Sequence, residues 1–396
     1  MKNKKRVYFW IVLSVLIILA IFTKYFFQDT RVLELNGNNE MVVELNKPFE
    51  DPGTNIEDVE IKGNVDVSKE GDYTLTYTYH KQSVSRIVFV RDSSRIVMNL
   101  NGSEDTYVLK NDPYIESFCH VIDKKTGQQI SDITINGNVD TSTPGEYEVT
   151  YSVEYDHMKF SKARIVHVEE NFQKNTKGVP VLMYHYVYTR DDVPKKLNSN
   201  YILDTDLEQQ LQYLIKNQYY FPSYQELHAY IEGKISLPEK SVVMTFDDAQ
   251  SKFLKYGIPL LEKYKIPATS FVIGIKNGDE KIKKNASEYI TFQSHSYDMH
   301  KPGGNIGHGG IISALNNEQI IKDLKKSQNL VQNKEAFAYP YGDYTKIAQL
   351  AVKEVDFLCA FTTEYGRVKK GMDYTCLPRI RVLGGYSLNT FIQSVN

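Results

Sequence analysis

Hydrophobic positions follow three different patterns along this chain. Residues 7–23 form an uncharged, mostly apolar run, VYFWIVLSVLIILAIFT, which predicts one helix. Within residues 31–170 apolar and polar residues alternate, and this period of two predicts half-buried antiparallel strands. From residue 179 onward, short apolar runs alternate with segments whose leucines recur at helical spacing. We therefore expect three structurally different parts.

The first part resembles a membrane segment. Four basic residues at positions 2, 4, 5 and 6 precede the 17-residue run. Its length is close to that of the shortest helices that span a membrane. We predict a cytoplasmic tail and transmembrane anchor over residues 1–28, and the positive-inside rule then places the remaining residues outside the cell. A cleaved signal peptide is the alternative, although no small-x-small cleavage site follows the run.

The middle part is an internal repeat. The segment IKGNVDVSKEGDYTLTYTY (61–79) matches INGNVDTSTPGEYEVTYSV (135–153), and VELNKPFED (43–51) matches VLKNDPYIE (108–116). Turn-forming pairs such as Pro144-Gly145 separate the alternating runs. We predict two all-β sandwiches, module 1 (29–93) and module 2 (94–170), which resemble bacterial immunoglobulin-like modules. They contain no clustered acids or ligands, so we expect spacers, with carbohydrate binding as the alternative.

The third part alternates predicted strands and helices. A polar stretch at 171–178 reads as a linker. Residues 179–396 then contain the predicted strands and helices, with strands at 179–184, 241–246, 269–274, 289–294, 336–339 and 357–362, and helices near 318–331 and 346–354. Repeated strand-then-helix order implies a parallel sheet, open or closed into a barrel, with its active site where the strands end.

Composition narrows the class of protein. Hydrophobic residues make up 41% and charged residues 24% of the chain, which excludes a disordered protein. Residues 31–170 carry 14 Lys/Arg against 25 Asp/Glu, and no dense basic run occurs elsewhere, so nucleic-acid binding is not expected. Three cysteines exclude a disulfide framework, and a single Cys359–Cys376 bridge stays open.

Polar residues at the predicted strand ends carry candidate chemistry. Asp247 and Asp248 end one strand, and both can face one site only where the strand breaks into a loop. His295 and His300 follow another strand and would converge only on a turn. Two histidines near an aspartate pair suggest a metal site with nitrogen and oxygen ligands. His185 ends a third strand in the same way.

Four motifs in order carry a family resemblance. TFDD (245–248), PLLEKYKIPATSFVIG (259–274), SHSYDMH (294–300) and AYPYGDY (338–344) resemble the polysaccharide deacetylase family, the NodB-homology enzymes of carbohydrate esterase family 4. The resemblance covers about residues 179–396. It implies a distorted (β/α)₇ barrel and a metal-dependent hydrolase that removes acetyl groups from N-acetylglucosamine units of a cell-wall or exopolysaccharide glycan.

The resemblance also implies residue roles. Asp247 would be the general base, and Asp248, His295 and His300 would bind a divalent metal, most often zinc. The backbone N–H of Tyr341 would stabilise the oxyanion. The whole chain would then be a single-pass cell-membrane protein with its catalytic domain outside the cell.

Two departures from the family pattern matter. Ala338 stands where many members carry an arginine that orients the base, so Arg379 or Arg381 is the candidate replacement. The usual C-terminal catalytic histidine is missing, because no histidine follows His308. In the poly-N-acetylglucosamine branch that strand is permuted to the start of the domain, and the five-residue spacing of the two motif histidines is similar to that branch. The sequence LMYH, ending at His185, resembles the permuted strand, which would make His185 the general acid.

Two other functions remain open at the level of sequence. A glycosidase on a similar barrel would use Asp247 and Asp248 as its acid pair, although adjacent residues seldom reach the separation that glycosidases need. A catalytically inactive glycan-binding surface protein would keep the barrel only to hold glycan, and Ala338 is compatible with it.

Overall fold

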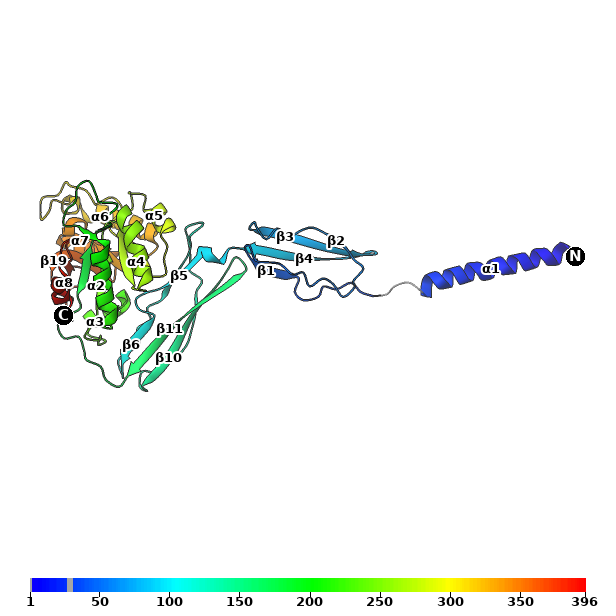
Figure 1. The fold of residues 1–396 in the computed structure, drawn as a ribbon, viewed down its shortest axis with the longest axis horizontal. Helices are drawn as coiled ribbons and strands as arrows, with labels where there is room; N and C mark the ends of the chain where they lie inside the picture. The colour runs from blue at the N-terminus through cyan, green and yellow to red at the C-terminus, as the bar shows by residue number, and fades with distance from the viewer. Residues whose placement is uncertain (1, 27–30) are drawn as a thin grey trace. The chain divides into compact units, whose positions relative to one another are not determined.

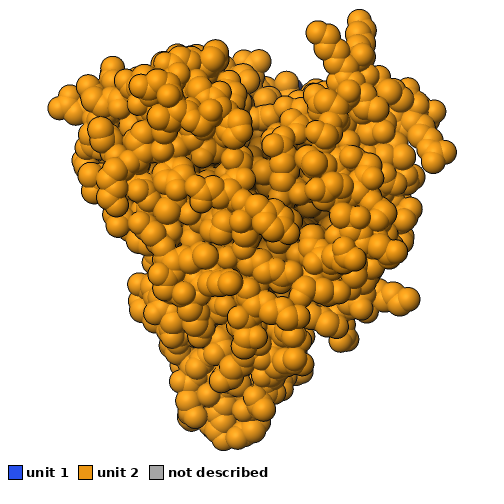
Figure 2. All heavy atoms as spheres, turned by 90° about the vertical axis from the view of Figure 1, so that its left-hand side faces the viewer, with its two compact units in different colours: residues 1–93 blue, residues 94–396 orange. Residues whose placement is uncertain are grey.

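The structure, a computed structural model, describes residues 2–26 and 31–396 (Figure 1). The chain folds into two compact units, unit 1 (Met1–Ser93) and unit 2 (Ser94–Asn396). Unit 2 holds module 2 together with the barrel, and its atoms form one continuous surface in the space-filling view (Figure 2). We describe each unit by itself.

The N-terminal helix corrects the membrane prediction. Helix α1 runs over Lys2–Phe26, and its side chains are described for residues 4–21. Three basic residues, Lys4, Lys5 and Arg6, fill the first of these positions, whereas a spanning helix needs about 20 predominantly apolar residues. Among the described residues no helix has the length and apolar character to cross a bilayer. The predicted transmembrane anchor and single-pass membrane localisation are therefore wrong. Residues 1, 27 and 28 of the predicted anchor lie outside the described residues.

Module 1 contains one four-stranded sheet in the order β1-β4-β3-β2. Its strands are β1 (Glu40–Glu44), β2 (Glu60–Lys62), β3 (Gly71–Tyr79) and β4 (Gln82–Arg91). Strand β1 pairs parallel with β4, and the other pairs are antiparallel. Beneath the sheet, the fully buried Arg86 guanidinium and the Tyr77 hydroxyl both contact the Asp51 carboxylate. This cluster neutralises the buried charge.

Module 2 repeats this arrangement. Its sheet β6-β11-β10-β9 matches the module 1 sheet strand for strand, with a second sheet β5-β7-β8 beside it. The strands are β5 (Ile96–Leu100), β6 (Asp105–Leu109), β7 (Cys119–Asp123), β8 (Gln128–Ile130), β9 (Thr134–Asn136), β10 (Gly145–Tyr155) and β11 (Met158–Glu169). Tyr151, Glu116 and Arg164 form the equivalent buried cluster. The alternating pattern thus yields half-buried strands in both repeats.

Seven parallel strands close into a barrel in the order β12-β15-β16-β17-β18-β19-β20. These are β12 (Val181–Tyr184), β15 (Val243–Phe246), β16 (Ala268–Val272), β17 (Ile290–Ser294), β18 (Ala336–Ala338), β19 (Cys359–Tyr365) and β20 (Leu377–Arg381). The helices are α2 (Asp204–Lys216), α3 (Tyr224–Ile231), α4 (Ile258–Lys263), α5 (Gly278–Lys284), α6 (Asn317–Val331), α7 (Lys346–Glu354) and α8 (Leu388–Val395). A two-stranded sheet, β13 (Tyr186–Tyr188) with β14 (Tyr201–Leu203), lies outside the barrel. The immunoglobulin-like and barrel parts are consistent with the predicted fold.

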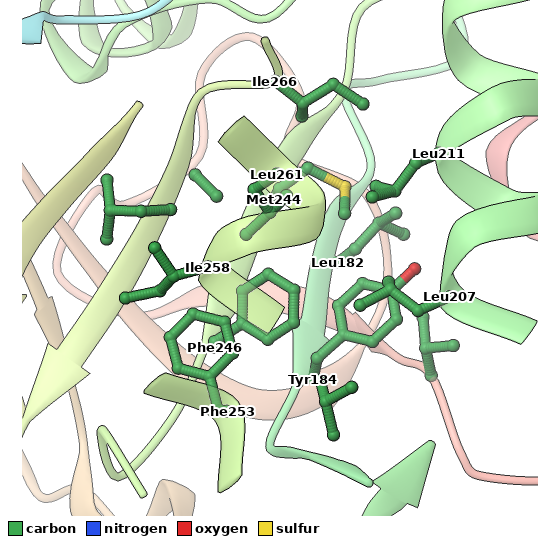
Figure 3. Packing of buried hydrophobic residues seen from close by; sticks show 14 of the residues in the cluster. Leu182, Tyr184, Leu207, Leu211, Met244, Phe246, Phe253, Ile258, Leu261 and Ile266 are labelled. Carbon is green, nitrogen blue, oxygen red and sulfur yellow. The ribbon is translucent and has the colours of Figure 1, made fainter. Parts of the chain in front are cut away.

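The barrel core fixes the strands that carry the site. Figure 3 shows Leu182 of β12 and Phe246 of β15 among buried side chains from α2 and α4, including Leu207 and Leu261. All four side chains are fully buried. Burying one such side chain stabilises the fold by about 1.5–3 kcal/mol. This packing therefore holds β12 and β15 rigidly, and with them the residues that follow these strands.

Module 2 packs directly against the barrel within unit 2. The Glu335 carboxylate, immediately before β18, accepts a hydrogen bond from Asn101 at 2.7 Å and contacts His120 Nε2 at 3.3 Å. Asn99 donates to the Ser287 carbonyl at 3.2 Å. The stretch predicted as a linker, 171–178, also lies against the barrel, and its Asn175 is buried. Module 2 therefore covers the amino ends of barrel strands rather than hanging from a free linker.

All three cysteines are free thiols. The Cys359–Cys376 bridge that the sequence left open is absent. Cys359 is fully buried on β19, and burial raises the pKa of its thiol. It therefore serves as a small apolar core residue.

Candidate active site

The aspartate pair sits where β15 leaves the barrel. Asp248 has φ 72° and the next residue, Ala249, φ 44°, so the backbone turns into the left-handed region directly after the strand. Aspartate tolerates this conformation better than most residues. The turn allows the consecutive Asp247 and Asp248 carboxylates to line one cavity, which a continued strand would prevent.

The two histidines converge because the loop after β17 is held in a turn. The Asp323 carboxylate of α6 accepts hydrogen bonds from the backbone N–H groups of Tyr297 and Asp298, both at 2.7 Å. The rings of His295 and His300 come to lie 4.8 Å apart. The five-residue spacing thus gives neighbouring imidazoles, as expected for a turn.

Asp248, His295 and His300 form a cluster suited to a cation. Their ligand atoms lie within 4.8 Å of one another, with Asp248 Oδ1 at 3.6 Å from His295 Nε2 and 3.3 Å from His300 Nε2. This buried Oδ1 has no hydrogen-bond partner among the described residues, while Oδ2 accepts from the Tyr186 hydroxyl at 2.5 Å. An unpartnered buried carboxylate oxygen is costly in protein alone, so the donor set fits a divalent metal.

Hydrogen bonding and burial prepare His295 as a ligand. Its Nδ1 lies 2.7 Å from the Ala338 carbonyl oxygen, so Nδ1–H donates there and Nε2 presents its lone pair to the cluster. Burial above all lowers the pKa of His295 to about 4, and the neutral ring is therefore present at pH 7. For Asp248, burial raises the pKa, but His300 and His295 lower it by more, so the carboxylate stays ionised.

Arg379 holds the other aspartate. Its guanidinium donates to both Asp247 oxygens, Nη1 to Oδ1 and Nη2 to Oδ2, each at 2.8 Å. Two further donations, from Nε to the Thr362 carbonyl and from Nη1 to the Thr245 hydroxyl, fix its plane. Burial raises the pKa of Asp247, but the Arg379 charge and hydrogen bonds lower it by more. Of the two arginines that the sequence offered as candidates, Arg379 binds Asp247, whereas Arg381 donates to Asn200.

His185 lies in the same cavity, directly after β12. Burial lowers the pKa of its imidazole; Asp247 and Asp248 raise it, while Arg379 and Arg381 lower it further, and the net shift is downward. Its ring is 5.7 Å from that of Tyr186.

Tyr341 contributes its backbone to the rim. It has φ 62°, and the following Gly342 has φ 79°. A Cβ at Gly342 would lie 2.1 Å from the Thr363 side chain, so only glycine fits. In the described part of the chain we find no acceptor for the Tyr341 N–H. This turn leaves the N–H available to a ligand.

One cavity of about 320 Å³ unites these residues. Its lining contains all six predicted site residues, His185, Asp247, Asp248, His295, His300 and Tyr341. It also contains His308, Tyr186, Asn200 and Arg381. Sequence reasoning did not single out Tyr186 or Asn200. Tyr186 could have been found from its place next to His185, whereas Asn200 lies in a polar loop without any pattern.

Comparison with known proteins relates both parts of the chain to families. The family described as "Polysaccharide deacetylase" matches residues 234–360, and the family described as "Bacterial surface protein, Ig-like domain" matches residues 33–91 and 98–168. A poly-β-1,6-N-acetyl-D-glucosamine N-deacetylase of Staphylococcus epidermidis is 30% identical over 246 residues, which cover 54% of this chain and 83% of that protein. The chain belongs to the polysaccharide deacetylase family. The predicted resemblance is confirmed.

Two further similarities concern the same region. The enzyme of the same name from Staphylococcus aureus strain MRSA252 is 28% identical over 205 residues, covering 48% of this chain and 70% of that protein. Among solved structures, Streptococcus pyogenes deacetylase PplD in complex with acetate is 24% identical, with a TM-score of 0.47, and covers 55% of this chain and 98% of that chain. As predicted, this polysaccharide deacetylase is a hydrolase of carbon–nitrogen bonds other than peptide bonds.

The family match does not cover the whole site. Residues 234–360 include Asp247, Asp248 and both cluster histidines, but neither His185 nor Arg379. His185 directly follows β12 and lines the cavity, whereas Arg379 lies on β20 and binds Asp247 from behind the lining. Strands β12 and β20 pair with each other where the barrel closes.

Proposed function

We propose that this polysaccharide deacetylase removes N-acetyl groups from a β-1,6-linked N-acetylglucosamine polymer. The observation that carries the proposal is the single cavity in which an arginine-paired carboxylate, a half-buried histidine and a three-ligand cluster face one another. The relatives from Staphylococcus epidermidis and Staphylococcus aureus, both named for this polymer, support the choice of substrate.

Asp248, His295 and His300 would hold a divalent cation. The unpartnered Asp248 Oδ1 and the Nε2 lone pair of His295 support this assignment. Two imidazole nitrogens with one carboxylate oxygen suit zinc and leave a position open. Such an ion, when bound, polarises the acetamide carbonyl and lowers the pKa of a water molecule.

Asp247 acts as the general base on the attacking water. Both its oxygens bind Arg379, which fixes the carboxylate orientation, yet each oxygen has a second lone-pair site that can accept a proton. Its lowered pKa keeps the carboxylate ionised at neutral pH. The Tyr341 N–H donates to the oxygen that develops negative charge, since the preceding Pro340 has no N–H.

His185 donates the proton that the departing amine requires. It is the described histidine of the cavity that lies outside the three-ligand cluster and directly after a barrel strand. Because its pKa is lowered, the ring gives up a proton readily once it carries one. As the C–N bond breaks, the protonated His185 ring passes its proton to the nitrogen, so the products are the amine, acetic acid and neutral His185. Acetic acid and the protonated Asp247 then release their protons to solvent, which leaves acetate and the ionised base.

Two features of the site, the lowered pKa values of both aspartates and the Arg379–Asp247 contact, argue against the two alternatives. A glycosidase pair needs one protonated carboxyl, but the pKa of Asp247 and that of Asp248 are both lowered. An inactive barrel would have lost the partner of its base, whereas Arg379 supplies it in place of Ala338.

The experiment compares the whole protein with its His295→Ala variant. We expect about one divalent metal per wild-type chain by elemental analysis, and acetate release from β-1,6-linked N-acetylglucosamine oligomers. In the variant both should fall together. Lys301→Ala, which removes an exposed ion pair with Asp298 next to the cluster, is the matched control and should keep both. Full metal content in His295→Ala would contradict the ligand assignment, and absence of acetate from the metal-loaded wild type would contradict the substrate.

A further inference from the structure

A second cavity lies between module 2 and the barrel, and the proposed chemistry does not use it. Its volume is about 540 Å³, within the range of small-molecule sites. Pro267 immediately precedes β16 and Tyr289 immediately precedes β17, so the cavity sits at the amino ends of the barrel strands. The catalytic residues follow the carboxyl ends. The two cavities therefore lie at opposite ends of the barrel.

Acidic and aromatic side chains line this second cavity together. Four carboxylates belong to its lining: Glu104, Asp105, Glu169 and Glu288. Lys162 bridges two of them, at 2.7 Å from Glu104 and 2.9 Å from Glu288. Glu169 has no side-chain partner among the described residues. Burial and the charges of Asp105 and Glu169 raise the pKa of Tyr107. His167 stacks on one face of the Tyr107 ring, with the ring centroids 5.0 Å apart, and its Nε2 lies 2.9 Å from the Asp105 carboxylate. Lys265 also lines the cavity. With Lys162 on Glu104 and Glu288 and His167 on Asp105, the carboxylate charge left beside Tyr107 is that of Glu169.

The internal repeat shows that this wall is special to module 2. In β6 and β11, Tyr107 pairs with His167 and Glu169 with Leu109, whereas the same register in module 1 places Val42 and Arg91 at the equivalent positions. Val42 offers no ring, and Arg91 reverses the charge. The same strand pair therefore folds without the tyrosine and the carboxylate, and in module 2 Tyr107 also packs edge-on against Tyr220 of the barrel domain, with the ring centroids 5.8 Å apart.

We propose that this cavity binds deacetylated, positively charged glucosamine units of the glycan. The proposal rests on the proposed function, because hydrolysis of each acetamide leaves an amine that is protonated at neutral and mildly acidic pH. An ammonium group pairs with carboxylates such as Glu169 and is attracted to the face of a tyrosine ring. Sugar rings pack against aromatic faces in the same site. An acetylated unit carries no charge and gains only the packing.

Binding product units at one end of the barrel would hold the polymer near the catalytic end. The second binding event then becomes intramolecular, which raises the effective concentration of acetylated units without any new contact at the catalytic residues. The cavity would thereby favour polymers that are already partly deacetylated over short, fully acetylated oligomers.

The test measures binding without turnover. A β-1,6-linked glucosamine hexasaccharide and its fully N-acetylated counterpart are titrated calorimetrically into the full chain carrying Asp247→Asn. We expect the glucosamine oligomer to bind and the interaction to weaken with added salt. Adding Tyr107→Val and Glu169→Arg gives module 2 the residues of module 1. In module 1, Arg91 forms an ion pair with Asp72, and Glu146 lies at the equivalent position in module 2. The arginine introduced at position 169 therefore has a carboxylate to pair with.

The double substitution should weaken glucosamine binding at least about tenfold, as loss of one charge-assisted contact does. Glu148→Gln, which removes an exposed carboxylate of β10 outside the cavity, is the matched control and should change nothing. Unchanged binding in the double variant, or equal affinity for the acetylated oligomer, would overturn the proposal. Should the double variant fail to fold, Glu169→Gln replaces it, with the same expected direction.

A kinetic arm separates this proposal from the proposed function. With Asp247 intact, Tyr107→Val/Glu169→Arg should raise KM on partly deacetylated polymer and leave kcat unchanged, while both constants stay at wild-type values on short acetylated oligomers. Equal losses on both substrates would overturn the second site. Failure of the wild type to release acetate would instead refute the proposed function, and the binding result would stand independently.

Discussion

Replacing Arg379 by methionine tests how the base is kept ionised. Asp247 is 3% exposed and Arg379 1% exposed, and two 2.8 Å hydrogen bonds join them. Methionine keeps an unbranched apolar stem but ends before the guanidinium, so it leaves the carboxylate buried without its positive partner. The substitution therefore removes the charge while it keeps the packing of the stem.

The size of the effect follows from burial. Two unit charges about 4 Å apart attract by about 4 kcal/mol at an effective dielectric constant of 20. Removing one partner of a buried pair destabilises proteins by about 3–5 kcal/mol, and we expect the free energy of unfolding of Arg379→Met to fall by that amount. Burial, which already raises the pKa of Asp247, would no longer be opposed by the arginine. The base would then be protonated over part of the working pH range.

The assay is acetate release measured from acidic to alkaline pH. We expect the acidic limb of the kcat profile to move to higher pH in Arg379→Met, with a loss of about 10²–10⁴-fold on that limb. Arg381→Met is the control: this neighbour lines the cavity but donates to Asn200 rather than to Asp247, so the acidic limb should stay in place.

Either of two results would refute the reasoning. If Arg379→Met loses activity equally at every pH, the arginine does not set the ionisation of Asp247. The double variant Asp247→Asn/Arg379→Met lacks both charges. Its free energy of unfolding should therefore be higher than that of Arg379→Met alone. A double variant no more stable than that single variant would show that the buried charge is not the source of the destabilisation.

Three further expectations concern the acid, the modules and their junction. His185→Ala should lower kcat by about 10²–10⁴-fold and remove the alkaline limb without loss of metal; near-normal kcat would assign the acid to another residue. A chain of residues 94–396 should keep the stability of unit 2, whereas 171–396 should unfold at lower denaturant because it exposes the Glu335 cluster; equal midpoints would contradict the observed docking. Burial lowers the pKa of His120, but Glu335 raises it by more, so this contribution to stability is full below the unfolded pKa of about 6.5 and is lost as pH rises through the folded value. His120→Gln should therefore cost about 1.5–3 kcal/mol at pH 6 and little at pH 9 in urea unfolding, and a pH-independent cost would refute the pairing.

Local periodicity determined most of the secondary structure. The predicted helix at 346–354 coincides with α7 (Lys346–Glu354), and the predicted strand at 241–246 contains β15 (Val243–Phe246). The element type of these two segments was predicted correctly because it follows from the order of apolar and polar residues within each segment. The N-terminal run shows the limit of the same signal, since hydropathy alone suggested an anchor that the described helix does not support.

Strand β20 was missed because its function disturbs its pattern. Leu377–Arg381 reads LPRIR, with a proline and two arginines in a barrel strand. Arg379 is buried there only because Asp247, 132 residues earlier, neutralises it. A propensity judged from neighbours cannot anticipate a partner so distant, and helices α5 and α8, which are short, were missed as well.

The sequence alone singled out the motif residues that line the cavity, because each motif is a run of a few residues after a strand. It narrowed the partner of the proposed base to two arginines but could not choose between them, since residues two apart on a strand point to the same face. The position along β20 decides which arginine binds Asp247. Arg379 lies two residues, about 6.6 Å, further from the rim of the barrel than Arg381. It donates to Asp247, while Arg381 donates to Asn200. The docking of module 2 was likewise decided only by the fold, because it depends on Glu335 meeting His120, 215 residues away in the chain.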